Sequence, residues 1–153
     1  MKKLIIGLVL AGACSRSTTT AGTPAAPAAP AGGSTTGAAS ERDAVTAFMT
    51  AINTGDLQAI GAIWGDESGP ARNRWQRDEL EQRELIMQRC LRHDRFKILG
   101  DPTMVGGQRT FSVELVRKGL TASTTLIAVR GPGGRWYVKQ ADIETPRQIC
   151  AQS

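Results

Sequence analysis

The sequence predicts an α+β domain in which three N-terminal helices pack on a curved four-stranded antiparallel meander sheet. Three observations carry this prediction. Apolar residues recur with a helical period up to about residue 92, the period changes to two after residue 94, and short turn sequences join the later apolar runs. Helices segregated from a meander in this way define the α+β class.

The first predicted helix follows Ser40, a residue suited to N-capping with Asp43 three positions later. The chain then turns at 53–55, and Asp56 is expected to cap a second, shorter helix that Gly65 closes. The stripes of the two helices are Val45, Phe48, Met49 and Ile52, then Leu57, Ile60, Ile63 and Trp64. The segment "GDESGPAR" that follows is predicted to be a loop.

The third predicted helix, from about Asn73 to Arg92, is highly charged. Its apolar seam is narrow at the start and widens toward the C-terminal end, so we expect only the second half to pack against the domain. The seam is formed by Leu80, Met87 and Leu91, with Ile86 and Cys90 beside it.

Four strands are expected after Asp94, in "RFKIL", "GGQRTFSVELVRKG", "GLTASTTLIAVRG" and "GRWYVKQADIE". The second places Phe111, Val113 and Leu115 on one face. The links "DPTMVGG", "RKG" and "GPGG" are typical of hairpin turns, which favours pairing between sequence neighbours. The tail "TPRQICAQS" is expected to form one helical turn that carries Cys150.

Residues 1–13 have the pattern of a secretory signal peptide. Lys2 and Lys3 precede a ten-residue apolar run that ends in small residues. A helix needs about twenty apolar residues to cross a bilayer, so this run is too short for a stable transmembrane span. The pattern predicts export.

Cys14 follows this leader directly, and "LAGAC" resembles the bacterial lipobox, in which the cysteine after the cut receives a diacylglyceryl group. Ala11 stands where the usual motif has leucine. The pattern predicts a bacterial lipoprotein held at the cell envelope through acylated Cys14, in the outer membrane rather than the inner one if the cell is Gram-negative. The alternative is a soluble secreted protein with one unpaired cysteine.

Residues 14–40 contain the lipidated cysteine and a disordered linker of small residues and proline, which has nothing large to bury. Residues 41–153 form the predicted domain. Three of the nineteen basic residues lie before residue 41, whereas all fourteen acidic residues lie from residue 41 onward, so the domain carries a net charge of only +2. Neither this charge nor the export signal favours nucleic-acid binding.

Lipidation of Cys14 leaves Cys90 and Cys150 as a pair. An exported chain meets an oxidising compartment, so we expect a disulfide between them that ties the tail to the end of the third helix. The alternative is two free thiols. A metal site is not expected, because the two cysteines and the single histidine, His93, lack metal-ligand spacing.

The stretch "AVTAFMTAINTGDLQAIGAIWGDE" resembles the opening of nuclear transport factor 2-like domains, and "GGRWYVKQADI" resembles their last strand. The resemblance covers about 41–143 and implies a cone-shaped α+β fold. That superfamily contains isomerases, cyclases, dehydratases, dimerising adaptors and exported lipoproteins without assigned activity, so the resemblance alone implies no function.

Enzymes of this superfamily place an aspartate, histidine or tyrosine inside the cone, and four residues here are weak candidates for that role. They are His93, Tyr137, Glu114 and Asp142. His93 is equally suited to a structural position at a helix end, where a cation interacts with the helix dipole. Strand alternation puts Tyr137 and Asp142 on opposite faces. No phosphate loop, catalytic triad or cofactor motif occurs, so no cofactor is expected.

Trp75 lies among arginines on the poorly packed start of the third helix. It is a candidate anchor for a protein partner or an anionic surface, or else a cover for the second helix or the cone's mouth. Two main functions follow, beside a third in which the chain is a purely structural protein of the cell envelope. One is a non-enzymatic module that binds a small apolar ligand or a protein, or forms a homodimer through its sheet face. The other is a small isomerase-, dehydratase- or cyclase-like pocket enzyme.

Overall fold

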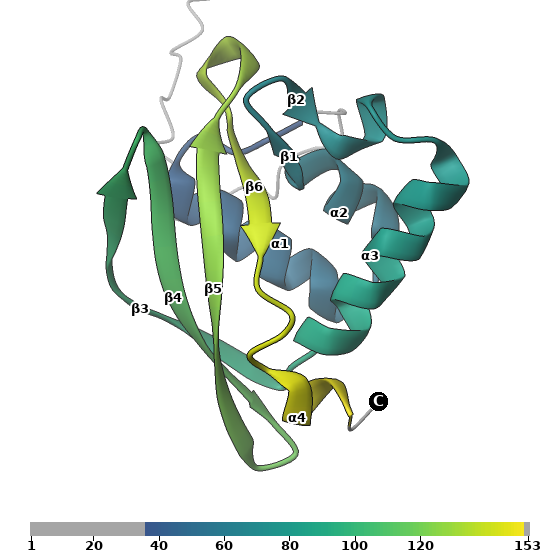
Figure 1. Ribbon diagram of the computed structural model, residues 1–153, viewed down its shortest axis with the longest axis vertical. Coiled ribbons are helices and arrows are strands. Elements are labelled where there is room, and N and C mark those ends of the chain that lie inside the picture. The colour runs from purple at the N-terminus through teal and green to yellow at the C-terminus, as the bar shows by residue number, and fades with distance from the viewer. Residues whose placement is uncertain (1–35, 152–153) are drawn as a thin grey trace, which may run out of the picture. The chain divides into compact units, whose positions relative to one another are not determined.

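The computed structural model describes residues 36–151, so Cys14, the predicted leader and most of the predicted linker lie outside the described residues. The described elements follow the predicted order of helices and then strands (Figure 1). They are α1 (Glu41–Thr54), α2 (Leu57–Ile63), α3 (Arg77–Leu91), β3 (Arg95–Val105), β4 (Gln108–Arg117), β5 (Leu120–Arg130), β6 (Trp136–Ala141) and α4 (Arg147–Cys150). The α+β class is confirmed.

The caps of the first two helices form as predicted. The Ser40 side chain accepts a hydrogen bond from the Asp43 backbone N–H, and Gly55 ends α1 in the left-handed conformation, with φ 68°. Asp56 caps α2 by accepting from the Ala59 backbone N–H at 2.9 Å. Both helices pack against β6 of the sheet.

The segment between α2 and α3 differs from the prediction in two respects. The predicted loop contains two short antiparallel strands, β1 (Gly65–Asp66) and β2 (Gly69–Pro70), followed by a 3-10 turn, η1 (Ala71–Asn73). The third helix begins at Arg77 rather than at Asn73, because Gln76 is extended, with φ −62° and ψ 144°. Helical periodicity alone does not reveal such a break.

The sheet has the order β3-β4-β5-β6, with every neighbour antiparallel, as expected for a meander. The edge strand β3 is longer than predicted, because "DPTMV" continues the strand after a bulge instead of forming the turn. While β3 advances from Leu99 to Thr103, β4 advances only from Thr110 to Ser112. Gly100, with φ 62°, provides the left-handed residue within this bulge.

A second bulge lies in β6. Ile127 pairs with Gln140 and Ala128 with Val138, which leaves Lys139 without a partner in the register. The extra residue reverses the alternation of faces. The predicted opposition of Tyr137 and Asp142 by parity is therefore wrong.

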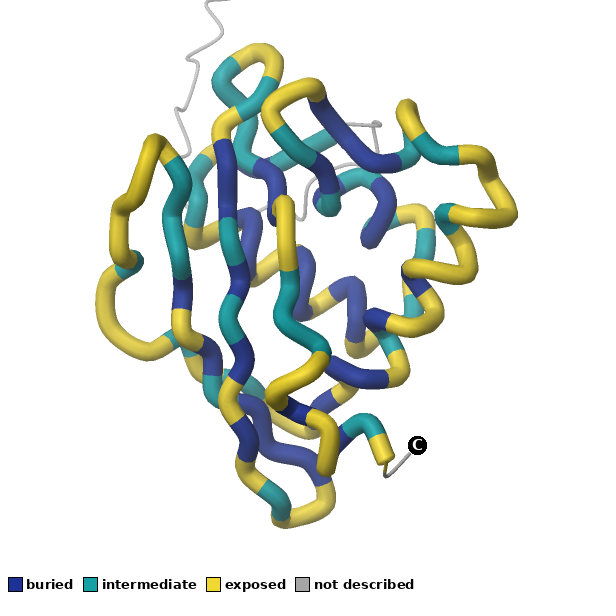
Figure 2. Tube along the Cα trace, in the orientation of Figure 1, coloured by how far each residue is buried: buried dark blue, intermediate teal, exposed yellow. Residues whose placement is uncertain are grey.

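The core lies between the helices and one face of the sheet, and burial alternates along β5 while β3 is mostly exposed (Figure 2). The predicted stripes of α1 and α2 and the predicted inward face of β4 all contribute to it. Its largest fully buried members include Phe48, Met49, Ile52, Ile60, Leu91, Phe111, Leu115, Leu126 and Ile149.

A disulfide joins Cys90 near the end of α3 to Cys150 in α4, across a sequence separation of 60 residues. The predicted pairing and the predicted helical turn of the tail are confirmed. Ile149 is fully buried in the core, so the tail is held by packing as well as by the covalent bond. Within residues 36–151 no helix has the length and apolar character needed to cross a membrane.

Candidate functional site

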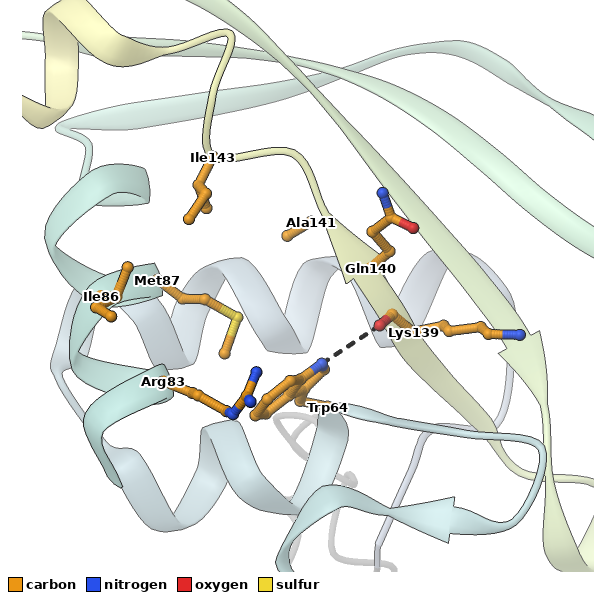
Figure 3. Close-up of a pocket in the computed structure, with 8 residues that line it drawn as sticks. All are labelled: Trp64, Arg83, Ile86, Met87, Lys139, Gln140, Ala141 and Ile143. Carbon is orange, nitrogen blue, oxygen red and sulfur yellow. Dashed lines mark hydrogen bonds between the residues drawn. The ribbon is translucent and has the colours of Figure 1, made fainter. Parts of the chain in front are cut away.

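A cleft of about 260 Å³ lies between α3 and the end of β6 and is here called the α3–β6 cleft (Figure 3). Its walls come from the end of α2, the middle of α3, β6 and the segment just after β6. The lining residues are Trp64, Arg83, Ile86, Met87, Lys139, Gln140, Ala141 and Ile143.

Trp64 forms one wall of the cleft and is held from two sides. It is the C-terminal cap of α2, and its indole Nε1 donates to the Lys139 carbonyl at 3.3 Å (Figure 3). That carbonyl belongs to the bulged residue of β6. The bulge therefore presents the carbonyl that holds the indole in the cleft. It also shifts the alternation of side chains along β6, so that Ala141 lines the cleft.

The cation that faces the cleft is Arg83, whose guanidinium lies beside Trp64 in Figure 3. Its Cζ lies 3.9 Å from the centre of the Trp75 ring, and its Nη2 donates to Glu79 Oε1 at 3.0 Å. The Lys139 side chain points away from the cleft and pairs with Glu67 at 2.9 Å (Figure 3). The cleft thus combines an apolar lining with one oriented guanidinium.

Trp75 lies half-buried in a stack. Its ring is 6.3 Å from that of Trp64, centre to centre, with 14° between the planes, and Arg83 covers it. The indole therefore packs beside the end of α2, which was one of its two predicted roles. Its Nε1 is buried without a hydrogen-bond partner among the described residues.

The remaining lining is aliphatic. Met87 is buried, whereas Ile86 is 52% exposed and lies across from Ile143 (Figure 3). Ile86 was expected beside the packed seam of the third helix, and its exposure corrects that expectation, since it borders the cleft instead. None of the described lining residues carries a carboxyl, imidazole, phenol or thiol group.

His93 lies away from the cleft, in the connection between α3 and β3. It is 5% exposed, its Nδ1 is 2.8 Å from the Leu91 carbonyl, and its ring meets Phe96 edge-on at 5.2 Å. Burial lowers the pKa of His93, although the Leu91 carbonyl and Asp94 oppose this shift. Burial therefore disfavours the cationic form that an interaction with the helix dipole requires.

Tyr137 is buried outside the main core, with its hydroxyl 3.1 Å from the Thr36 hydroxyl. Glu114 lies half-buried on β4, opposite Lys97 and Ser123 in the neighbouring strands. Neither residue lines the α3–β6 cleft.

Asp142 shapes the turn after β6. It accepts hydrogen bonds from the backbone N–H groups of Glu144 and Thr145 and from the Thr145 hydroxyl. The Thr145 hydroxyl is the main cause of its lowered pKa, and the backbone N–H groups add to it. The four candidate acid–base residues are therefore not brought together, and none reaches the α3–β6 cleft.

Glu84 is the residue that the sequence reasoning missed. It is 2% exposed, and its Oε1 has no hydrogen-bond partner among the described residues. Burial, together with repulsion from Glu81, raises its pKa to about 7. The signal was available, because Glu84 falls between Leu80 and Met87 on the predicted apolar line, where a charged residue is unusual.

No group of three or more histidine, cysteine or acidic residues within 36–151 is placed to hold a metal ion. Among the pockets of the described residues, the α3–β6 cleft combines apolar surface with a guanidinium group, and the one beside Glu84 has an unpartnered buried carboxyl oxygen in its wall.

No protein-family model matches the chain, and no curated protein matches it. The chain is similar to several solved structures, three of which are described here. A structure described as "Rd1NTF2_04 with long sheet" is 18% identical, with a TM-score of 0.39, and the match covers 67% of this chain and 97% of that one.

The other two are nuclear transport factor 2-like proteins of unknown function. The one from Shewanella oneidensis MR-1 is 15% identical, with a TM-score of 0.41, and the match covers 65% of this chain and 92% of that one. The one from Cytophaga hutchinsonii ATCC 33406 is 16% identical, with a TM-score of 0.35, and the match covers 72% and 94%. The function of this chain is therefore argued from its own residues.

Proposed function

We propose that this chain is an exported lipoprotein whose domain binds a small, mainly apolar ligand in the α3–β6 cleft. In this proposal residues 1–13 are removed, acylated Cys14 holds the chain at the cell envelope, and the linker up to residue 40 separates the membrane from a nuclear transport factor 2-like domain. The domain binds its ligand without transforming it.

The observation that carries the binding proposal is the chemistry of the cleft lining. Trp64, Met87, Ala141 and Ile143 offer apolar surface, and burying such surface is worth about 25 cal/mol per Å². Arg83 supplies a fixed donor group beside that surface. A ligand with an apolar body and one acceptor or anionic group fits this combination.

The same lining favours binding over catalysis. General acid–base chemistry needs a titratable group within hydrogen-bond reach of the bound molecule. His93, Tyr137, Glu114 and Asp142 are not among the residues that line the cleft. A homodimer through the sheet face stays a prediction, which analytical ultracentrifugation of the purified protein tests.

The ligand proposal is tested with anilinonaphthalene sulfonate, an apolar ring system with one anionic group. The full chain carrying Cys14→Ser, purified without detergent, is titrated while energy transfer from tryptophan is recorded. Ala141→Trp fills the cleft and is expected to abolish saturable binding. Arg83→Met keeps the stem and removes the charge, so it is expected to weaken binding about tenfold.

Arg77→Met is the matched control, because Arg77 is another exposed arginine of α3 and does not line the cleft. It is expected to leave dye binding unchanged. Dye binding that survives Ala141→Trp undiminished contradicts the ligand proposal.

The proposed attachment to the membrane through Cys14 is tested separately, by fractionating cells that express the chain. Cys14→Ser is expected to move the protein from the membrane pellet to the soluble fraction and to remove incorporation of labelled palmitate. Cys90→Ser is the matched control and is expected to leave both unchanged. A Cys14→Ser protein that stays in the membrane pellet refutes the lipid anchor.

A further inference from the structure

A second pocket, here called the α2–α3 pocket, has a volume of about 200 Å³ and lies between the start of α2 and the first half of α3. It shares no lining residue with the α3–β6 cleft. Its lining is Leu57, Gln58, Arg77, Leu80, Glu81 and Glu84. Glu81 and Gln58 are exposed, whereas Glu84 is buried. The pocket therefore has a solvated rim and a buried carboxyl group in its wall.

The Glu84 carboxyl group reaches its position because α2 has a glycine opposite it. A Cβ placed on Gly61 would lie 2.6 Å from Glu84 Oε1, so any side chain at residue 61 displaces the carboxyl group. This oxygen is buried and finds no donor among the described residues. Leaving a buried acceptor unpaired costs free energy, which a ligand with N–H donors would recover.

The charges around Glu84 are few. On α3 they are Glu81 and Arg77, and α2 has no charged residue between Leu57 and Ile63. Asp56 is occupied in capping α2, and Arg72 of η1 packs its Cβ toward Gly61. Burial and the neighbouring Glu81 both raise the pKa of Glu84. A cation bound in the pocket would stabilise the ionised Glu84 carboxylate and so counteract the effects of both burial and Glu81 on its pKa.

We propose that the α2–α3 pocket binds a small primary ammonium ion, which donates hydrogen bonds to Glu84 Oε1 and to the Glu81 carboxylate. An ammonium group carries three donors and one positive charge in a compact volume. Two carboxyl groups without a third acidic or histidine ligand favour an organic cation over a metal ion, which takes more ligands. Leu57 and Leu80 accommodate a short alkyl group.

The test uses propylammonium chloride and the ¹⁵N-labelled full chain carrying Cys14→Ser, followed by backbone amide shifts. At about pH 8, saturable shifts are expected at Gln58, Gly61 and Glu84. Tetramethylammonium carries the same charge without N–H donors and is expected to bind about tenfold more weakly. At about pH 6, affinity is expected to fall about tenfold, because a group with a pKa of about 7 is then mostly protonated.

Two variants keep the proposal testable. Glu84→Gln preserves shape and is expected to lower affinity at least about tenfold and to remove the pH dependence. Arg77→Gln lies at the exposed side of the pocket and is expected to raise affinity a few-fold, since it removes a like charge.

Three outcomes would overturn the proposal. They are the absence of saturable shifts with propylammonium at the higher pH, equal binding of tetramethylammonium, and an affinity that Glu84→Gln leaves unchanged. Failure of this site leaves the proposed function of the α3–β6 cleft untouched, because the two share no lining residue.

Discussion

Glu84 makes the stability of the domain depend on pH in an unusual direction. Its pKa in the folded chain is about 7, against 4.5 for an unperturbed glutamate. At a pH between these two pKa values, Glu84 is largely protonated in the folded chain and largely ionised in the unfolded chain. Stability therefore falls as the pH rises through this window, opposite to the usual behaviour of a salt-bridged carboxylate.

The size of the effect follows from the two pKa values. Each pKa unit corresponds to about 1.4 kcal/mol, so ionisation of Glu84 removes about 3 kcal/mol of unfolding free energy between pH 4.5 and 7. This is a large share of the typical stability of a small domain, about 5–15 kcal/mol.

The measurement is the urea-induced unfolding of the wild-type chain and of Glu84→Gln, at several pH values from about 4 to 8, with the disulfide intact. The difference between the two proteins isolates Glu84, because every other titrating group is common to both. The unfolding free energy of Glu84→Gln minus that of the wild type is expected to rise by about 3 kcal/mol as the pH rises. A difference that stays constant across the range refutes the account of Glu84.

Three further outcomes concern packing and covalent structure, each read from urea unfolding. Gly65→Ala is expected to cost about 1–3 kcal/mol, because the added Cβ would lie 2.3 Å from the Gly69 carbonyl oxygen, and an unchanged midpoint contradicts this close approach. Replacing Cys90 and Cys150 by serine is expected to cost about 4 kcal/mol from the closed loop, and insensitivity of the wild type to reductant argues against the disulfide. Trp75→Leu is expected to cost about 1–3 kcal/mol, because the ring stack with Trp64 and the contact with Arg83 are lost. An unchanged free energy of unfolding contradicts a stabilising role for these contacts.

The sequence predicted the parts of the fold that rest on local patterns. The α1 stripe, the Ser40 and Asp56 caps and the inward face of β4 follow from periodicity and capping chemistry, and all appear in the structure. The disulfide followed from the two cysteines that remain once Cys14 is set aside as a lipidation site, in a chain predicted to be exported.

The parts that failed depend on register and on contacts distant in sequence. Gly100, Asp101 and Pro102 have turn composition, yet they form a bulge inside β3 because β4 continues to pair beyond them. The bulge at Lys139 reversed a parity argument in the same way. Neither bulge leaves a signal in hydrophobic alternation alone.

The candidate site was even harder to predict from the sequence than the bulges were. The α3–β6 cleft combines Trp64 and Arg83 with residues more than fifty positions later, and only the packing of α3 beside β6 brings them together. Glu84 was visible as an acid on an apolar line, but its lack of a partner depends on the glycine that faces it from α2.

The most direct test of the ligand proposal is native mass spectrometry of the chain purified from its own cells. The account predicts a small molecule bound in one copy per chain, retained by Arg77→Met and lost from Ala141→Trp, which fills the α3–β6 cleft. A chain that carries no such molecule, or one that Ala141→Trp still retains, contradicts it.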